Sequence, residues 1–422
     1  MRTRPLQKYL FSFADQGFVS AGLFLATFAL ARNTHPSDFG PFAVARDAVL
    51  FVTMMQVAII TRPLTVFRNA LSAPSERQVY TASSMALQHW YIALSLLVVA
   101  GWLFLAVPAL SLVFAVAVLF FCATYQCREY RRFLHFSDLR LDRATALSGV
   151  YLLGVLLGVG GLAALHALSP LGTILGLGAA GLVAWLIDLR WYGEVPSVAP
   201  RIAFQRNLGF SFWEIIGGFG NFVYVGAIPL VLGMAGRLDE AGGYGAARNL
   251  LGPIQVAVFA VYNVLVPQNT VLAESNIQGA VRHSVRIGGL MWLSSLAVVI
   301  PIVAFGGSAM ATLYNPSYER FGSSLGMLGI YYVMMVPTAV FHSLLLGLGQ
   351  PRLKALSQLC GMIVGAIFLF LHRHELDARL GALATMAGEV AVAGTAGLIV
   401  ALAVYSTRAQ ESLEPRTDPT DG

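Results

Sequence analysis

Long apolar runs separated by short polar segments dominate the chain. Each run is about 20 residues long, the length that an α-helix needs to cross the hydrocarbon core of a membrane. The runs lack the strict alternation of a membrane-spanning strand, so a closed barrel is excluded. The pattern predicts twelve transmembrane helices, near residues 11–31, 41–61, 82–104, 107–127, 144–166, 170–190, 209–232, 243–266, 284–305, 322–347, 353–371 and 381–405.

Composition supports an all-α integral membrane protein. The 422 residues are 57% hydrophobic and only 11% charged, whereas soluble domains carry about 25% charged residues. Little sequence remains for a large domain outside the membrane. Arg2, Arg4 and Lys8 before an apolar run are also compatible with a signal peptide. However, Asp15 interrupts that run and many spans follow, so we interpret it as the first transmembrane helix.

Basic residues gather in alternate loops. If the N-terminus is cytoplasmic, the cytoplasmic segments hold about four times as many Lys and Arg residues as the outer ones, which is the expected bias. The C-terminus then also lies in the cytoplasm. We interpret the basic segment 126–133 as a cytoplasmic loop that contacts anionic lipid, or as a portal that attracts a lipid-linked phosphate. The net charge of +6 therefore reflects membrane topology and predicts no nucleic-acid partner.

An internal repeat divides the chain into two halves. A repeat with an even number of helices relates its halves by an axis along the membrane normal. We therefore predict two six-helix lobes, 1–199 and 200–405, with a central cleft that opens to alternate sides and a disordered cytoplasmic tail at 406–422. Three pairs of short segments match in order: 11–15 with 210–214, 44–47 with 246–249, and 143–148 with 352–357.

Two arginines at matched positions of the repeat are the main candidates for substrate binding. Arg46 and Arg248 lie within predicted helices, where a charged group is costly and often functional. Guanidinium groups facing the cleft would hold an anionic substrate such as a phosphate. Asp47 need not neutralise Arg46, because adjacent residues of a helix point about 100° apart. The alternatives are snorkelling to the outer interface or a structural pair with Asp47 or Asp15.

A matched acidic pair, Asp15 and Glu214, lies near the cytoplasmic ends of the first and seventh helices. The helix dipole alone would favour carboxylates in an N-terminal turn. The functional alternatives are ion or proton coupling, or a gating ion pair with a basic residue such as Arg62 or Arg206. We assign Asp15, Glu214 and Arg62 to a candidate gate or coupling site.

Polar side chains of the eighth helix complete the candidate site. Asn249, Tyr262 and Asn263 would need partners if they faced lipid, so they are predicted to face the cleft, where amides and aromatic rings suit sugars. The alternative is that they join helices by hydrogen bonds.

Known catalytic and metal-binding patterns are missing from the sequence. It has no P-loop, HExxH, GxSxG or dinucleotide fingerprint. Its three cysteines, Cys122, Cys127 and Cys360, are interpreted as small core residues. We therefore predict no catalytic residue, no metal, no cofactor and no enzymatic activity.

Several segments together resemble bacterial polysaccharide exporters of the multidrug/oligosaccharidyl-lipid/polysaccharide (MOP) superfamily, in particular the O-antigen and exopolysaccharide flippases. The resemblance implies a V-shaped twelve-helix bundle in the inner membrane. Its cationic cleft would move an undecaprenyl-pyrophosphate-linked oligosaccharide to the outer leaflet, beside membrane lipids and possible polymerase or glycosyltransferase partners. Arg46 and Arg248 match positions that are often cationic in such clefts. The segments are 15–20, 62–64, 126–133, 140, 144, 244–253, 266–267 and 347–352.

Three functions remain open from the sequence. The leading one is a flippase for lipid-linked oligosaccharides in exopolysaccharide or O-antigen biosynthesis. A multidrug or cation antiporter of the same superfamily would instead depend on Asp15 or Glu214. A non-transporting subunit of a glycan-assembly complex would have a closed, apolar interface between the lobes. The sign of the charge that lines the cleft distinguishes the three.

Overall fold

The computed structural model describes residues 5–107, 111–192, 198–275 and 277–413, and their regular structure is entirely helical. Within these ranges, eleven helices are long and apolar enough to cross a membrane, and a twelfth span results if one bent pair is counted together. The chain is therefore a multi-pass membrane protein, as the apolar pattern predicts.

The first half of the chain forms seven α-helices and a short π-helix. α5, α6 and α7 pack against one another and α1 packs against α6, whereas α1, α2 and α4 also contact helices of the second half. The bounds are α1 (Pro5–Asn33), α2 (Pro36–Gln56), the π-helix η1 (Val57–Thr61), α3 (Arg62–Ala70), α4 (Pro74–Ala106), α5 (Leu112–Ser137), α6 (Leu141–Ala164) and α7 (Pro170–Tyr192).

The second half follows the same plan with two additional breaks. α13 packs against α11, α12 and α15, and α14 joins α15 to α8. The bounds are α8 (Arg201–Val225), α9 (Ile228–Met234), α10 (Leu238–Leu250), α11 (Gly252–Ser275), α12 (Ile277–Leu313), the 3₁₀ helix η2 (Pro316–Phe321), α13 (Gly322–Gly347), α14 (Pro351–Leu371) and α15 (Ala378–Leu413).

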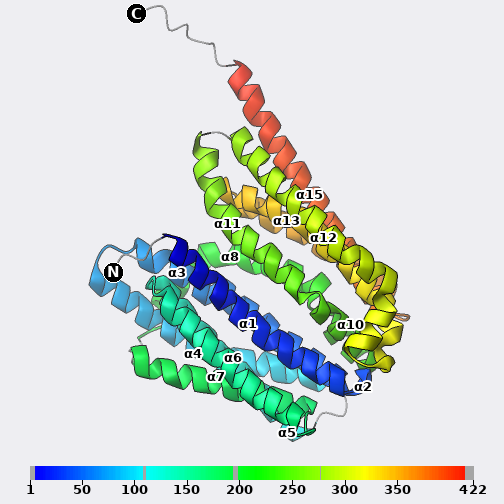
Figure 1. The fold of residues 1–422 in the computed structure, drawn as a ribbon. Coiled ribbons are helices and arrows are strands. Elements are labelled where there is room, and N and C mark those ends of the chain that lie inside the picture. Colours follow the sequence, from blue (N-terminus) through cyan, green and yellow to red (C-terminus); the bar gives the residue numbers. More distant parts are fainter. Residues whose placement is uncertain (1–4, 108–110, 193–197, 276, 414–422) are drawn as a thin grey trace, which may run out of the picture.

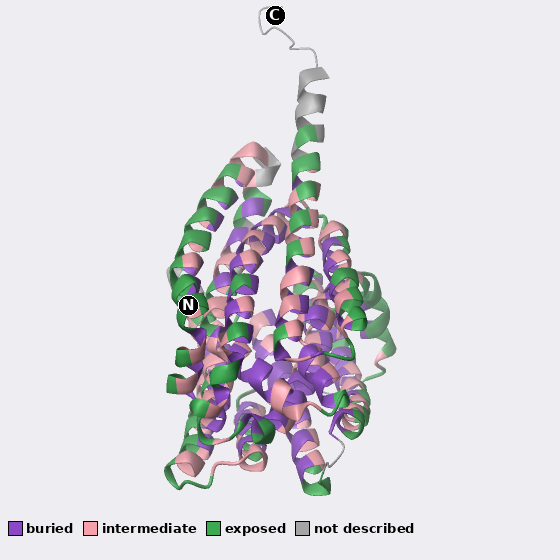
Figure 2. Ribbon diagram, turned by 90° about the vertical axis from the view of Figure 1, so that its right-hand side faces the viewer, coloured by how far each residue is buried: buried purple, intermediate pink, exposed green. Residues whose placement is uncertain are grey.

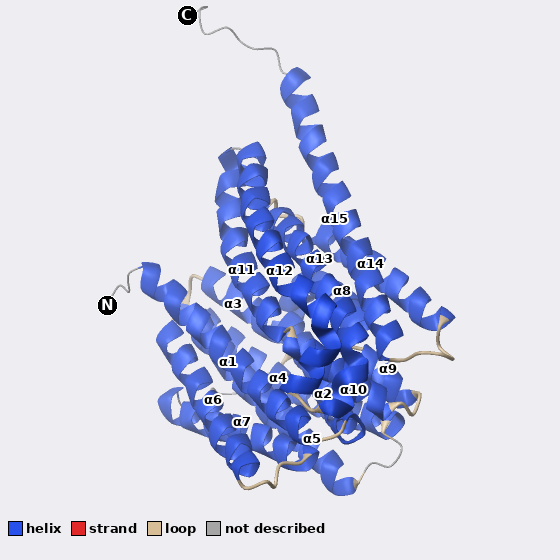
Figure 3. Ribbon diagram, turned by 45° about the vertical axis from the view of Figure 1, so that its right-hand side comes forward, coloured by secondary structure: helices blue, strands red, loops and turns tan. Residues whose placement is uncertain are grey.

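The two halves form a V. They separate toward the end where α1 begins and α15 ends, and they meet at the opposite end around α2 and α10 (Figure 1). A view turned by 45° shows the same division between α1, α6 and α7 on one side and α11 to α15 on the other (Figure 3). Buried residues gather toward the closed end (Figure 2). The open end is therefore the end that carries the N-terminus.

Glycines bring α2 and α10 into backbone contact at the closed end. A Cβ atom on Gly40 would lie 2.0 Å from the carbonyl oxygen of Leu238, and one on Gly242 would lie 2.1 Å from that of Pro36. No side chain fits there, so glycine is required at both positions. Nearby, the Asn315 amide donates a hydrogen bond to the Thr34 carbonyl at 3.0 Å and ties the turn before η2 to the end of α1.

Two spans expected to be continuous are broken, which corrects the predicted boundaries. The span over 209–232 divides into α8 and α9, which meet at a bend of 56°. Pro229 lies in the first turn of α9 and cannot continue the α8 hydrogen-bond ladder. The span over 243–266 divides at Leu251 into α10 and α11. Arg248 and Asn249 therefore lie at a helix end.

The segment 126–133 is not a cytoplasmic loop, because α5 continues to Ser137. Its basic side chains are buried and paired with carboxylates from α1, α5 and α7. Because each of these charges has a partner of opposite charge within the protein, they can be buried in the helix bundle without contact with water. We call this group the N-terminal ion network; it comprises Asp15, Arg128, Glu129, Arg131, Arg132 and Asp188.

The predicted disordered tail at 406–422 also needs correction, because α15 continues as a helix to Leu413. The remaining residues, 414–422, lie outside the described part of the chain.

Candidate functional site: a cationic cleft between the two halves

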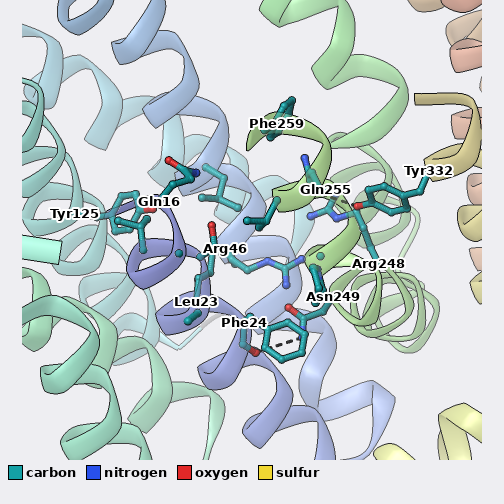
Figure 4. A pocket seen from close by; sticks show the side chains of 18 residues that line it. Gln16, Leu23, Phe24, Arg46, Tyr125, Arg248, Asn249, Gln255, Phe259 and Tyr332 are labelled. Carbon is teal, nitrogen blue, oxygen red and sulfur yellow. Dashed lines mark hydrogen bonds between the residues drawn. The ribbon is translucent and has the colours of Figure 1, made fainter. Parts of the chain in front are cut away.

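A cavity of about 520 Å³ lies between the halves of the V. One wall comes from α1, α2 and α5, and the other comes from α10, α11 and α13. Figure 4 shows Arg46 and Arg248 reaching into this space from opposite walls. The repeat therefore brings its two matched arginines to one cavity.

One carboxylate joins the two arginines. Asp47 accepts a hydrogen bond from Arg46 Nε at 2.9 Å and contacts Arg248 Nη2 with both oxygens, at 2.5 and 2.6 Å. The pair of Arg46 with Asp47, one of the alternatives that the sequence left open, is thus present, and the same carboxylate also contacts Arg248. We call Arg46, Asp47 and Arg248 the cleft trio. With two cations and one anion, the trio carries one excess positive charge.

The break between α8 and α9 positions Arg248. A broken helix leaves its last carbonyl groups without backbone partners. The Val225 carbonyl at the end of α8 accepts hydrogen bonds from Arg248 Nη1 at 3.0 Å and from the Tyr244 hydroxyl at 3.1 Å. Arg248 also lies in the last turn of α10, where the helix dipole favours a cation. The guanidinium is therefore fixed by the backbone before any ligand binds.

Amides and aromatic rings line the rest of the cavity. Gln255 accepts a hydrogen bond from the Tyr332 hydroxyl at 3.3 Å, and the Asn249 amide donates to the Phe24 carbonyl at 3.3 Å (Figure 4). Gln16 and Tyr125 line the opposite wall. Such a surface combines hydrogen-bonding groups with flat apolar faces, which suits a sugar as well as a phosphate.

Of two further candidates from the sequence, one does not line this cavity and the other lies outside the described side chains. Tyr262 is half-buried in α11 and is not among the residues that line the cavity. Asn263 lies in the same helix, but its side chain is outside the described part of the structure.

Asp15 lies behind the cleft wall rather than in the cleft. Its carboxylate accepts hydrogen bonds from Arg132 Nη1 and from the Ser148 hydroxyl, both at 2.6 Å. Only 1% of Asp15 is exposed. The carboxylate is therefore already occupied by groups of its own half.

Glu214 and Arg62 form an ion pair between the halves. Lys354 Nζ lies 3.6 Å from the other Glu214 oxygen. This is the pair offered above as a gate, and it lies away from the cavity-lining residues. Its position links α3 of the first half to α8 and α14 of the second.

Comparison of the sequence with known proteins finds one similar transport protein and no matching family model. No family model matches the chain. The succinoglycan biosynthesis transport protein ExoT of Rhizobium meliloti (strain 1021) is 26% identical over 336 residues, which cover 76% of this chain and 65% of that protein, just under two thirds of its length.

Two solved structures share the fold over most of the chain. An inward-facing multidrug resistance MATE family transporter of the MOP superfamily superimposes with a TM-score of 0.67 at 14% identity, covering 95% of this chain and 96% of its own. The lipid II flippase MurJ in an inward closed conformation gives 0.67 at 10% identity, covering 93% and 87%. Together the comparisons confirm the resemblance to the MOP superfamily.

Some cavity residues carried little signal in the sequence. Gln16 lies next to Asp15 in an apolar run and could have been found as another polar residue at membrane depth. Tyr125 comes from a helix rich in aromatic residues, and Tyr332 directly follows another tyrosine, so neither stands out. They line the cavity because of how α5 and α13 pack in the folded protein, and this packing cannot be read from a local sequence pattern.

Proposed function

We propose that the protein moves a lipid-pyrophosphate-linked oligosaccharide from the inner to the outer leaflet of the bacterial cytoplasmic membrane. The lipid would be of the undecaprenyl-pyrophosphate type, and the product would serve exopolysaccharide or O-antigen biosynthesis. Polymerases or glycosyltransferases would be its partners in the pathway. The protein acts as a transporter, not an enzyme.

The cleft trio is the observation that carries this proposal. A pyrophosphate offers several anionic oxygens, whereas Asp47 offers two. It can therefore replace Asp47 as the partner of Arg248 and Arg46, and planar guanidinium groups bind phosphate in a bidentate manner. The one excess positive charge already favours an anion before Asp47 moves.

Cleft geometry also suits the two ends of such a substrate. The pyrophosphate and sugars would occupy the polar cavity while the prenyl chain stays in lipid. This avoids moving polar groups through hydrocarbon, where each unsatisfied group costs several kcal/mol. The amides and rings of Gln16, Gln255 and Tyr125 would contact the sugars.

Alternating access supplies the movement. The basic residues that remain in alternate loops, without the buried arginines of α5, still favour cytoplasmic termini and hence a cytoplasmic open end of the V. The lobes 1–199 and 200–405 would rock about each other, so that the α2–α10 contact at the closed end separates as the cytoplasmic end closes. The MATE structure with a similar fold is described as inward-facing, which supports this orientation.

The charge of the cleft argues against the other two functions. A cation antiporter needs an accessible carboxylate, but Asp15 is paired with Arg132, and Glu214 is paired with Arg62 and Lys354. A non-transporting subunit would have an apolar interface between its halves, whereas this one contains a cavity lined by two arginines.

A leaflet-resolved export assay tests the proposal. In the native bacterium, Arg248→Ala should cause lipid-linked saccharide to accumulate on the cytoplasmic leaflet and should reduce polymer export at least tenfold. Arg320→Ala is the matched control, because Arg320 is exposed and pairs with Asp239 far from the cavity. Normal export in the Arg248→Ala strain, at equal protein abundance, would overturn the proposal.

A further inference from the structure

The ion pair between Asp47 and Arg248 crosses from one half of the protein to the other. Asp47 lies on α2 and contacts Arg248 Nη2 on α10 with both carboxylate oxygens, at 2.5 and 2.6 Å. The carboxylates of the N-terminal ion network, in contrast, pair with arginines of their own half. The Asp47–Arg248 contact therefore ties the two halves together where α2 and α10 meet.

This ion pair lies beside the glycine contact that closes one end of the V. The close approach of α2 and α10 continues to Gly245, where an added Cβ atom would lie 2.9 Å from the Cβ atom of Ala43 and 3.7 Å from Arg46 Nη2. Separation of α2 from α10 would pull the two partners of the ion pair apart. The ion pair is therefore a feature of the conformation in which this end is closed.

The cavity itself offers the two arginines no anion. Arg46 and Arg248 both line it, whereas Asp47 does not, and no other Asp or Glu of the described residues lines it. Within the described part of the chain, no other carboxylate forms an ion pair with either arginine. An anion that enters the cavity therefore competes with Asp47 for the same two guanidinium groups.

The closed end needs an anion between the two arginines. Arg46 belongs to the first half and Arg248 to the second, and their charges are close enough to repel each other. Such repulsion is strong in an interior that holds little water. A transporter that has released its substrate has to close this end while its cleft is empty. A carboxylate of the protein itself removes the repulsion at that step.

We propose that Asp47 is a built-in substitute for the phosphate of the substrate, which closes this end of the empty protein and so returns it to the inward-open state. The pyrophosphate displaces Asp47 from Arg248 during export, and Asp47 takes its place again after release. The role in the transport cycle rests on the proposed function, whereas closure of the empty protein by Asp47 does not depend on the identity of the substrate.

Distances between spin labels in the empty protein test the closure step. In a background without native cysteines, labelled cysteines replace Leu165 and Leu371, which are exposed at the closed end of the first and the second half. Double electron–electron resonance of the full-length protein in nanodiscs should show that Asp47→Asn increases the population of longer distances about threefold. Added inorganic pyrophosphate should reverse this change because it replaces the missing negative charge, whereas chloride at the same ionic strength should not.

The matched control is Asp239→Asn, which breaks an ion pair with Arg320 inside the second half. It should leave the distances as they are in the unaltered protein. An unchanged distribution in Asp47→Asn, or a change that pyrophosphate does not reverse, would overturn the proposal.

Arg248→Gln tests the same contact if the Asp47 variant does not fold. It breaks the ion pair between the halves but leaves Asp47 paired with Arg46, so it creates no repulsion. We expect the longer distances to gain population, but less than in Asp47→Asn. Pyrophosphate should have no effect, because one of the two guanidinium groups is missing. Distances equal to those of the unaltered protein would contradict closure by this ion pair.

Net movement and exchange of a substrate analogue test the return step. The probe is a fluorescent farnesyl pyrophosphate-linked N-acetylglucosamine in vesicles that contain the full-length protein. Net movement requires the empty protein to return, whereas exchange against unlabelled probe in the opposite leaflet does not. Asp47→Asn should therefore slow net movement about fivefold more than exchange.

Equal slowing of net movement and exchange would overturn the role of Asp47 in the return step. If the unaltered protein does not move the probe at all, that result counts against the proposed function. Closure of the empty protein by Asp47 is then still decided by the distances between the spin labels.

Discussion

Two groups of buried charges lie within the same membrane protein, and their charge balance differs. The N-terminal ion network joins three guanidinium groups to three carboxylates from α1, α5 and α7. The cleft trio joins two guanidinium groups to one carboxylate. The first is enclosed by helices of one half, whereas the second lines a cavity between the halves.

Under the proposed function, this difference separates structural charges from the charges that bind substrate. A balanced group needs no external partner, and breaking it leaves an uncompensated charge in a low-dielectric interior. An unbalanced group beside a cavity attracts an ion of the opposite sign. Charge within a membrane is therefore a weak sign of function by itself, and the excess over local partners is the stronger sign.

Breaking the network should produce the largest loss of stability. Arg132→Ala removes the cation shared by Asp15 and Glu129, so we expect the free energy of unfolding to fall by about 3–5 kcal/mol. Thermal unfolding in detergent measures this effect. Arg248→Ala is the comparison, and it should cost clearly less because Asp47 keeps Arg46 as a partner. Equal losses in the two variants would remove the distinction between the groups.

The glycine contact at the closed end can be broken next. Gly242→Val places atoms where the Pro36 carbonyl lies, so it should disfavour the inward-open state by about 1–3 kcal/mol, the usual cost of overpacking. A cysteine at Ser20 in the cleft, in a background without native cysteines, should then react faster with a membrane-impermeant thiol reagent added from outside.

Gly160→Val is the matched control for this experiment, because a Cβ atom on Gly160 meets no atom within 4 Å. Identical labelling of the two variants would show that the α2–α10 contact does not close the outer side.

Changing Asp47 alters the charge of the trio directly. Asp47→Asn raises its excess charge from one to two and removes the carboxylate that competes with the substrate. We expect a soluble prenyl pyrophosphate to bind about tenfold more tightly, a gain of about 1.4 kcal/mol, while transport slows because release becomes harder. Isothermal titration calorimetry measures the affinity. Weaker binding would mean that Asp47 orients the arginines more than it competes with the ligand.

The Arg62–Glu214 pair should have the smallest effect. The Arg62 side chain is 47% exposed, and exposed pairs contribute about 0–1 kcal/mol. Glu214 also keeps Lys354 nearby. Arg62→Ala should therefore change export less than twofold in the assay described above. A loss comparable to that of Arg248→Ala would instead establish the pair as a gate.

The sequence predicts the spans well but misses what interrupts them. Runs of apolar residues report burial in lipid, so the helices and their order follow directly. The breaks at Ala227 and Leu251 depend on Pro229 and Pro253, whose effect a hydropathy pattern does not register. The segment 126–133 looked like a loop because its charges lacked visible partners.

The partners of those charges are distant in the chain. Arg131 pairs with Asp188 and Arg132 with Asp15, residues contributed by other helices. The repeat did align Arg46 with Arg248, because duplication preserves position within a helix. The repeat alone does not predict that Asp47 contacts both arginines. The contact with Arg248 requires α2 and α10 to lie close together, which the glycines at their contact permit.

Binding of geranyl pyrophosphate to the purified protein tests the central claim most directly. Isothermal titration calorimetry would compare the unaltered protein with Arg46→Ala, Arg248→Ala and the control Arg320→Ala. Loss of one charged hydrogen-bond donor costs about 1.5–3 kcal/mol, so each cleft variant should bind about 10- to 100-fold more weakly, with the control unchanged. Affinities within twofold of one another in all four proteins would contradict a phosphate site in the cleft.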